Sequence, residues 1–397
     1  MADQALTGIK VLDLSQDIAG PYCAKLFADY GAEVIKIEPP EGDPSRRAGP
    51  FLNDEPHPER SGLFMHLNTN KLGVTLNLET ATGAELFKEV VQDADAVVES
   101  FPPGKMADLG LSYETLEAIN PKLVMVSITP FGQTGPYKDF VFTELTAWAM
   151  GSRMSITGQM EREPHPLGGN AAQYLAGTQA ATAGMGALMG AILQGAGQHV
   201  DVCMQETLLG AVDARLLFTE YTKDVATRGD NPAAGFQFCQ DGFVQFPANF
   251  VQPRQWNRMV RLLDMPELLE DPRFLTPGDR GVHRDDLDAI ILPWLLDRSK
   301  YQIAEAAQAE GVFAAPVLDV GEVVESEHFA SRGYFVEVDH PETGPVRYGG
   351  APFQMGETPW AIRRPPPLLG QHNVEIYCDR LGRAKEDLVK YRQTGVI

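Results

Sequence analysis

The first forty residues constrain the fold of this chain most strongly. A short apolar run at Val11–Leu14 is followed by a turn-rich segment, Ser15–Pro21, and then by a helical pattern over Tyr22–Tyr30. Gly31 ends this predicted helix, and Val34–Ile37 is the next apolar run. A strand, a loop, a helix and a second strand in this order predict a parallel, doubly wound α/β sheet. The loop lacks the GxGxxG pattern, so the sequence does not support a nicotinamide or flavin site.

The rest of the chain predicts two domains, which is the default expectation for 397 residues. Further apolar runs at Ala96–Glu99 and Leu123–Ile128 extend the predicted Rossmann-like sheet of a large domain, residues 1–220. Amphipathic helical patterns and a hairpin-like segment then predict a smaller α+β domain over 221–325. The remaining segment, 326–397, is rich in Pro and Gly.

Composition excludes several classes of partner. The net charge is −21, from 33 basic and 54 acidic residues, which argues against nucleic acid and against an anionic membrane. An anionic ligand must therefore meet a local basic patch. The four cysteines form no CxxC pair, and no His and carboxylate cluster has metal-ligand spacing, so neither disulfides nor a metal site is predicted. Without a leader or a long apolar run, the chain is predicted to be cytoplasmic.

A proline- and glycine-rich segment, Pro166–Gly177, precedes a run of small uncharged residues, Thr178–Gly190. The run predicts a buried helix that packs closely on its neighbours, and the segment before Gly177 is predicted to be a loop. The N-terminus of a helix carries unpaired N–H groups and a positive dipole end, which favour an anion. Gln173 is the polar residue predicted to lie there.

Sequence blocks along nearly the whole chain, in this order and spacing, resemble the class III CoA-transferases. This is the CaiB/BaiF superfamily of formyl-CoA transferase, carnitine CoA-transferase and α-methylacyl-CoA racemase. The blocks that carry the resemblance include Gly8–Ser15, Ala19–Pro21, Asp29–Glu38, Leu109–Leu111, Gly132–Pro136, Gly197–Val202, Asp271–Phe274 and Leu369–His372. The resemblance implies a C-terminal segment that returns to the large domain, and two chains threaded through one another as an interlocked dimer.

The resemblance also assigns the expected catalytic positions. The transferases of this family use a nucleophilic Asp where this chain has Gln173, and a neutral amide cannot form an acyl anhydride. Gln173 is then either a hydrogen-bond donor to a ligand or a cap of the helix that follows. Glu144 matches a supporting acidic position. Thr143 stands where the racemase branch has His, so the base for racemisation is missing.

The expected CoA contacts combine residues of the family pattern with basic residues suited to phosphate. Arg46 and Arg47 lie on a turn-rich loop, and Arg forms forked hydrogen bonds to phosphate. Ser100 and Asp108 depart from the family's usual Asn and Arg, and Leu72 replaces another Arg. The whole predicted set is Ile18, Ala19, Arg46, Arg47, Lys71, Leu72, Ser100, Phe101, Lys105 and Asp108. CoA thioesters are the expected substrates, with no permanently bound cofactor.

The sequence therefore predicts a class III CoA-transferase fold without its own nucleophile. The leading hypothesis is a non-catalytic subunit that pairs with a homologous Asp-bearing subunit, as in the succinyl-CoA:benzylsuccinate type. The complex would move CoA from an acyl-CoA such as succinyl-CoA to a carboxylic acid such as a substituted succinate. The alternatives are a self-sufficient acyl-CoA-processing homodimer, of isomerase or lyase type, and a non-enzymatic acyl-CoA-binding protein.

Overall fold

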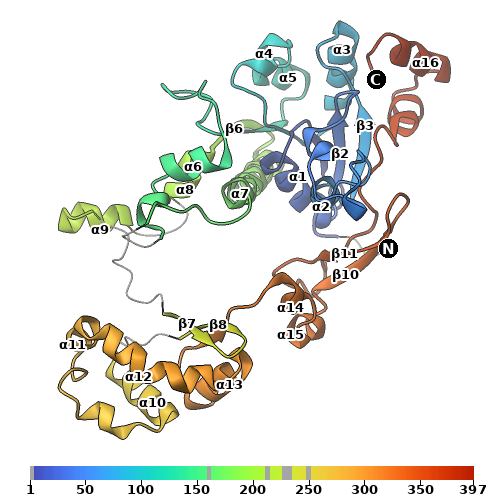
Figure 1. The fold of residues 1–397 in the computed structure, drawn as a ribbon. Coiled ribbons are helices and arrows are strands. Elements are labelled where there is room, and N and C mark those ends of the chain that lie inside the picture. The colour runs from blue at the N-terminus through green and yellow to red at the C-terminus, as the bar shows by residue number, and fades with distance from the viewer. Residues whose placement is uncertain (1–3, 159–161, 211–214, 226–234, 247–251) are drawn as a thin grey trace. The chain divides into compact units, whose positions relative to one another are not determined.

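The computed structural model describes residues 4–158, 162–210, 215–225, 235–246 and 252–397. The chain divides into two compact units (Figure 1). Unit 1 comprises Met1–Thr157, Pro164–Asp224 and Ser331–Ile397, and unit 2 comprises Gly158–Glu163 and Val225–Ala330. The C-terminal segment thus belongs to unit 1. The structure changes units after 224 and 330, where the sequence analysis placed boundaries at 220 and 325.

Unit 1 is built on a six-stranded sheet of order β3-β2-β1-β4-β5-β6, with every neighbouring pair parallel. The predicted doubly wound α/β architecture is confirmed. Alternate residues of a strand face opposite sides of the sheet, so Val11 and Leu12 of one strand enter different hydrophobic cores. The strands are β1 (Lys10–Asp13), β2 (Glu33–Glu38), β3 (Lys71–Thr75), β4 (Ala96–Glu99), β5 (Val124–Thr129) and β6 (Gln198–Cys203).

Helices cover both faces of this sheet (Figure 1). One core contains residues of α1 (Ala19–Asp29) and α7 (Ala171–Gln194), and the other contains residues of α3 (Ala81–Val91) and α5 (Tyr113–Ile119). The remaining helices of this unit are α2 (Gly62–Leu67), α4 (Lys105–Asp108), α6 (Glu144–Met150), α8 (Met204–Gly210), α9 (Arg215–Thr222) and α16 (Lys385–Gln393). Short 3-10 turns η1 (Pro44–Arg47), η2 (Leu52–Asp54) and η3 (Met154–Ile156), and a π-helical turn η5 (Val374–Arg380), complete it.

Helix α7 packs closely on its neighbours, as its small residues predict. A Cβ atom on Gly177 would lie 2.5 Å from the carbonyl oxygen of Ala19 in α1, so only glycine permits this approach. A Cβ on Gly184 would lie 3.2 Å from Val126 of β5. The prediction of a loop before Gly177 is wrong, because the helix already begins at Ala171.

The C-terminal segment closes the edge of the sheet at β3. The backbone N–H of Gly73 donates to Nδ1 of His372, and that of Thr75 donates to Oδ1 of Asn373, both at 2.9 Å. These bonds satisfy donors that an edge strand would otherwise present to solvent. The segment also contains an antiparallel hairpin, β10 (Phe335–His340) and β11 (Gly344–Gly349).

Unit 2 has its own sheet and its own core. Its three strands are antiparallel and lie in the order β7-β8-β9. Trp256, Phe274 and Leu287 are among the buried residues of its hydrophobic core. The elements are β7 (Phe236–Cys239), β8 (Gly242–Gln245), β9 (Ala315–Pro316), α10 (Pro253–Leu263), η4 (Pro266–Leu269), α11 (Pro277–Val282), α12 (Arg284–Leu296), α13 (Lys300–Glu310) and α14 (Val320–Val324), with α15 (Glu327–Ser331) at the boundary. Across the described parts of the chain, no helix is long and apolar enough to span a bilayer.

Candidate active site

Two loops meet where the strand order of the sheet reverses, between β1 and β4. The backbone N–H of Gln16, after β1, donates to Oγ of Ser100, after β4, at 2.9 Å. Ile18 and Ala19 begin α1 at the same place and are 5% and 4% exposed. In open α/β sheets, ligands bind at this crevice outside the carboxyl ends of the strands. The structure thus brings predicted site residues from separate segments together.

A buried charged network, which sequence reasoning missed, lies beneath the loop after β1. Asp13 pairs with Lys71 at 2.8 Å, and Lys36 pairs with Asp43 at 2.8 Å. The Lys36 ammonium also donates to the backbone carbonyl of Ser15, and Asp13 accepts from the Ser15 backbone at 3.1 Å. These bonds fix the path of the loop that leads to α1. The sequence signal was a charged residue inside an apolar strand, as in Lys36 of β2.

The network places Lys71 in the interior. All three of its ammonium donors are used, by Asp13, by Oδ1 of Asn68 and by the Pro21 carbonyl. Burial lowers the pKa of Lys71 to about 8, against the opposing effect of Asp13. Burial disfavours the Asp13 carboxylate, but Lys36 and Lys71 outweigh this effect and hold its pKa below the ordinary value. Lys71 is 0% exposed, so the structure gives it a role in the loop's support.

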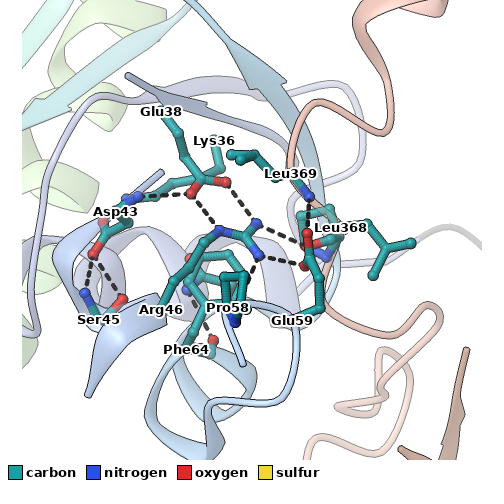
Figure 2. Close-up of polar contacts among 12 residues, drawn as sticks. Lys36, Glu38, Asp43, Ser45, Arg46, Pro58, Glu59, Phe64, Leu368 and Leu369 are labelled. Atoms are coloured by element: carbon teal, nitrogen blue, oxygen red, sulfur yellow. Dashed lines mark hydrogen bonds and ion pairs between the residues drawn. The ribbon is translucent and has the colours of Figure 1, made fainter. Parts of the chain in front are cut away.

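Arg46 is likewise enclosed by the protein (Figure 2). Its guanidinium donates to both carboxylate oxygens of Glu38, at 2.6 and 2.8 Å, and to Glu59 at 2.6 Å. A further bond reaches the carbonyl of Pro367 at 3.0 Å, and the group lies 3.6 Å from the ring centroid of Phe64. Contact with a phosphate would break these carboxylate pairs, so this placement does not support Arg46 as a CoA ligand.

The other predicted CoA residues divide between the interior and the surface. Leu72 is 4% exposed and belongs to a hydrophobic core, against which Phe101 packs. Arg47 and Asp108 are exposed, and Arg47 donates to the carbonyl of Glu41 at 3.0 Å. Lys105 pairs with Glu79 at 2.7 Å near the surface. Among the predicted CoA residues, all of which the structure describes, Arg47 and Lys105 are the cations that solvent reaches.

Glu144 holds the helix turn in which Gln173 lies. One oxygen of Glu144 accepts from the backbone N–H of Ala172 at 2.7 Å and from the indole N–H of Trp148 at 2.9 Å. Its other oxygen is buried and makes no hydrogen bond to the described residues. Glu144 therefore supports the first turn of α7 directly.

Gln173 itself lies in that first turn and is not its cap. The N-cap position of α7 is Asn170, which makes no side-chain cap bond. The Gln173 side chain is half-buried and makes no hydrogen bond to the described residues. The capping alternative is therefore wrong, and the amide is free to meet a ligand.

A cavity of about 810 Å³ is lined by Tyr22 of α1 and by Thr178 of α7. The ring of Tyr22 meets the ring of Tyr174, the residue after Gln173, edge to face, with centroids 4.9 Å apart. The cavity is lined by residues that include Leu6, His66 and Trp360, but by none of the predicted site residues. No group of three or more metal-ligating side chains occurs among the residues that the structure describes.

Comparisons with known proteins show the family of this chain. The model of CoA-transferase family III matches residues 6–373. The chain belongs to CoA-transferase family III. It is 33% identical to a succinyl-CoA–D-citramalate CoA-transferase of Chloroflexus aurantiacus, over 99% of this chain and 98% of that protein. It is 32% identical to a formyl-CoA:oxalate CoA-transferase of Streptomyces avermitilis, over 99% of this chain and all of the relative.

A solved structure confirms the family III fold. The CaiB/BaiF family protein of Brucella suis superposes with a TM-score of 0.84 and is 29% identical, covering 95% of this chain and 99% of its own. CoA-transferases of this family use CoA thioesters as substrates. The class III assignment made from the sequence is confirmed.

Proposed function

We propose that this chain is the supporting, non-catalytic subunit of a heteromeric family III CoA-transferase. The observation that carries the proposal is Gln173, a free amide in the first turn of α7, where the family's carboxylate nucleophile is expected. The turn is intact and held by Glu144. The scaffold of the site is kept while its nucleophile is absent, which suits a subunit that serves a homologous, Asp-bearing partner.

The chemistry explains why an amide fails. In the transfer, a carboxylate attacks the acyl-CoA carbonyl, the thiolate of CoA leaves and a mixed anhydride forms. The thiolate then attacks the enzyme's carbonyl of that anhydride, the donor acid leaves and an enzyme–CoA thioester remains. The acceptor carboxylate repeats these steps in reverse. The Gln173 amide is neutral and a weak nucleophile, so the anhydride would form on the partner's Asp. Gln173 would then donate a hydrogen bond to a carbonyl or carboxylate.

The proposed reaction moves CoA from an acyl-CoA such as succinyl-CoA to a carboxylic acid such as a substituted succinate. Two relatives support this substrate class, since their names give succinyl-CoA with D-citramalate and succinate with glutarate. In an interlocked dimer, residues of this chain would line part of the partner's pocket. The proposed CoA contacts include four residues at the place where the strand order reverses and two cations near the surface. They are Ile18, Ala19, Ser100 and Phe101, and Arg47 and Lys105.

A second candidate is a self-sufficient homodimer that processes an acyl-CoA without an anhydride. The free, buried oxygen of Glu144 favours it, because a carboxylate beside the site could act as a general base.

Native mass spectrometry of the complex from its own host tests the proposal. We expect a hetero-oligomer with a second chain of similar size that carries Asp at the position of Gln173. A homodimer that turns over CoA esters alone would overturn the proposal in favour of the second candidate. Binding of CoA esters without turnover or partner would identify a non-enzymatic acyl-CoA-binding protein.

A further inference from the structure

Three polar side chains on neighbouring strands of the sheet lead from its interior to solvent, with His199 opposite Met125 near the amino end of β6. Glu99 ends β4, Ser127 lies beside it in β5, and His199 lies in β6. Oγ of Ser127 is 2.8 Å from Nε2 of His199, and Ser127 is the register partner of Glu99, so its hydroxyl and the Glu99 carboxylate lie on the same face of the sheet. Glu99 is 2% and Ser127 1% exposed, whereas His199 is exposed. The row connects a buried carboxyl group to the surface.

The inner end of this row holds the turn after β4. Oε2 of Glu99 accepts a hydrogen bond from the backbone N–H of Phe101 at 2.7 Å. Ser100, in the same turn, receives the N–H of Gln16 from the loop that leads to α1. Glu99 is thus bonded to the turn after β4, which is itself bonded to the loop between β1 and α1.

We propose that Ser127 and His199 carry protons between Glu99 and solvent, so that the charge of Glu99, and its hold on the Ser100–Phe101 turn, follows pH. Glu99 is a positioning residue in this scheme, because it acts through the turn. That the turn meets CoA rests on the proposed function, whereas the relay itself does not.

The proton transfer balances along the row. In the protonated state, the Glu99 carboxyl donates to Oγ of Ser127, and the Ser127 hydroxyl donates to the unprotonated Nε2 of His199. On deprotonation, Glu99 passes its proton to Ser127 while Ser127 passes its own to Nε2, and Nδ1 of His199 releases a proton to water. One proton leaves, and the neutral histidine changes from its Nδ1–H to its Nε2–H tautomer. The Glu99 carboxylate then accepts charge-assisted bonds from Ser127 and Phe101.

The surroundings place this titration near neutral pH. Burial raises the pKa of Glu99 to about 7, and the Asp201 carboxylate of β6 adds to this effect. Burial lowers the pKa of His199, opposed by Asp201 and by Glu114 of α5. The ring of Tyr113 stacks on His199 with centroids 5.6 Å apart, and both residues line a cavity of about 130 Å³ with Glu99 and Ser127. Glu99 therefore titrates while His199 is neutral.

Nuclear magnetic resonance of the imidazole ¹⁵N nuclei tests the relay in the full-length protein. We expect His199 to change from the Nδ1–H to the Nε2–H tautomer as the pH rises through about 7. Glu99→Gln should lock the Nδ1–H tautomer at every pH, because the amide donates to Ser127 permanently. Glu114→Gln, the matched control at an exposed position of α5, should leave the change in place. Retention of the change in Glu99→Gln would overturn the relay. If Glu99→Gln does not fold, Ser127→Ala must abolish the change, and its persistence there would overturn the relay equally.

Amide exchange of Phe101 tests the hold on the turn. After correction for intrinsic exchange, its protection against local openings that leave Glu99 buried should rise roughly five- to tenfold from pH 6 to pH 8, since a charged acceptor strengthens the bond. The rise in protection should vanish in Glu99→Gln. Protection of Phe101 that does not change with pH in the wild type would overturn the proposal that the charge of Glu99 controls this turn. Calorimetric titration with CoA then judges the proposed function separately. A rise in protection without CoA binding would remove the turn from the ligand site and leave the relay intact.

Discussion

One oxygen of Glu144 bonds the backbone nitrogen of Ala172, the residue immediately before Gln173, at 2.7 Å. The same oxygen bonds Trp148 of α6. A single carboxylate therefore joins two helices and fixes the turn of the predicted site. This structural role is enough to account for a carboxylate at Glu144, whether or not the chain carries out chemistry.

Glu144→Ala should destabilise unit 1. It leaves the Ala172 N–H and the Trp148 indole without their acceptor, at about 1–3 kcal/mol for an unsatisfied buried group. Glu144→Gln keeps an oxygen acceptor and should lose less. Urea unfolding of both variants measures the difference, and equal losses would show that the hydrogen bonds contribute nothing.

Lys71→Met should cost about 3–5 kcal/mol, because it strands the buried Asp13 carboxylate. Lys105→Met removes a cation from the exposed pair with Glu79 and should lose far less stability, because solvent screens that pair. Denaturant midpoints of the two variants give the comparison. Similar losses would contradict the buried network.

Gly177→Ala should destabilise the protein by about 1–3 kcal/mol, because its Cβ overlaps the Ala19 carbonyl. The control in the same helix is Gly186→Ala, where a Cβ meets no atom within 4 Å. That change should be neutral or stabilise by up to about 1 kcal/mol. Thermal unfolding measures the stability of both variants. A Gly177→Ala variant as stable as the wild type would mean that α1 and α7 separate readily.

The free energy of unfolding should fall as the pH rises from 4.5 to about 7, in proportion to the titration of Glu99. The folded pKa exceeds the unfolded one, so the native state binds more protons in this window and loses stability as they dissociate. The contribution is about 3 kcal/mol at most. Subtracting the profile of Glu99→Gln isolates it, and identical profiles would exclude Glu99 as the source.

Gln173→Asp should not restore CoA transfer by the isolated chain. The exposed Asp108 would repel a phosphate bound next to it, and the Arg46 guanidinium is held by Glu38 and Glu59. Chromatographic assay of CoA-ester exchange should show activity no higher than in Gln173→Asn. Near-normal turnover would mean that the missing carboxylate was the only defect.

The sequence predicted the parallel sheet and α7, because uninterrupted apolar runs and small residues report burial directly. It missed Asp13 and Lys36, since a charge within a strand is recognisable as buried only when its distant partner is known. Arg46 was predicted to face a phosphate for the same reason. Its carboxylate partner Glu59 comes from another loop, and the carbonyl of Pro367 comes from the far end of the chain.

The hydrogen bonds of His372 and Asn373 to β3, and that of the Asn77 N–H to the carbonyl of Val396 at 2.7 Å, also bear on biosynthesis. A ribosome releases β3 long before it releases the residues that cover it. The nascent sheet therefore carries an open, pairing-competent edge until the residues around 372–396 have been made. Chains that stop before His372 should be prone to self-association, and chaperone demand should last until this segment is made.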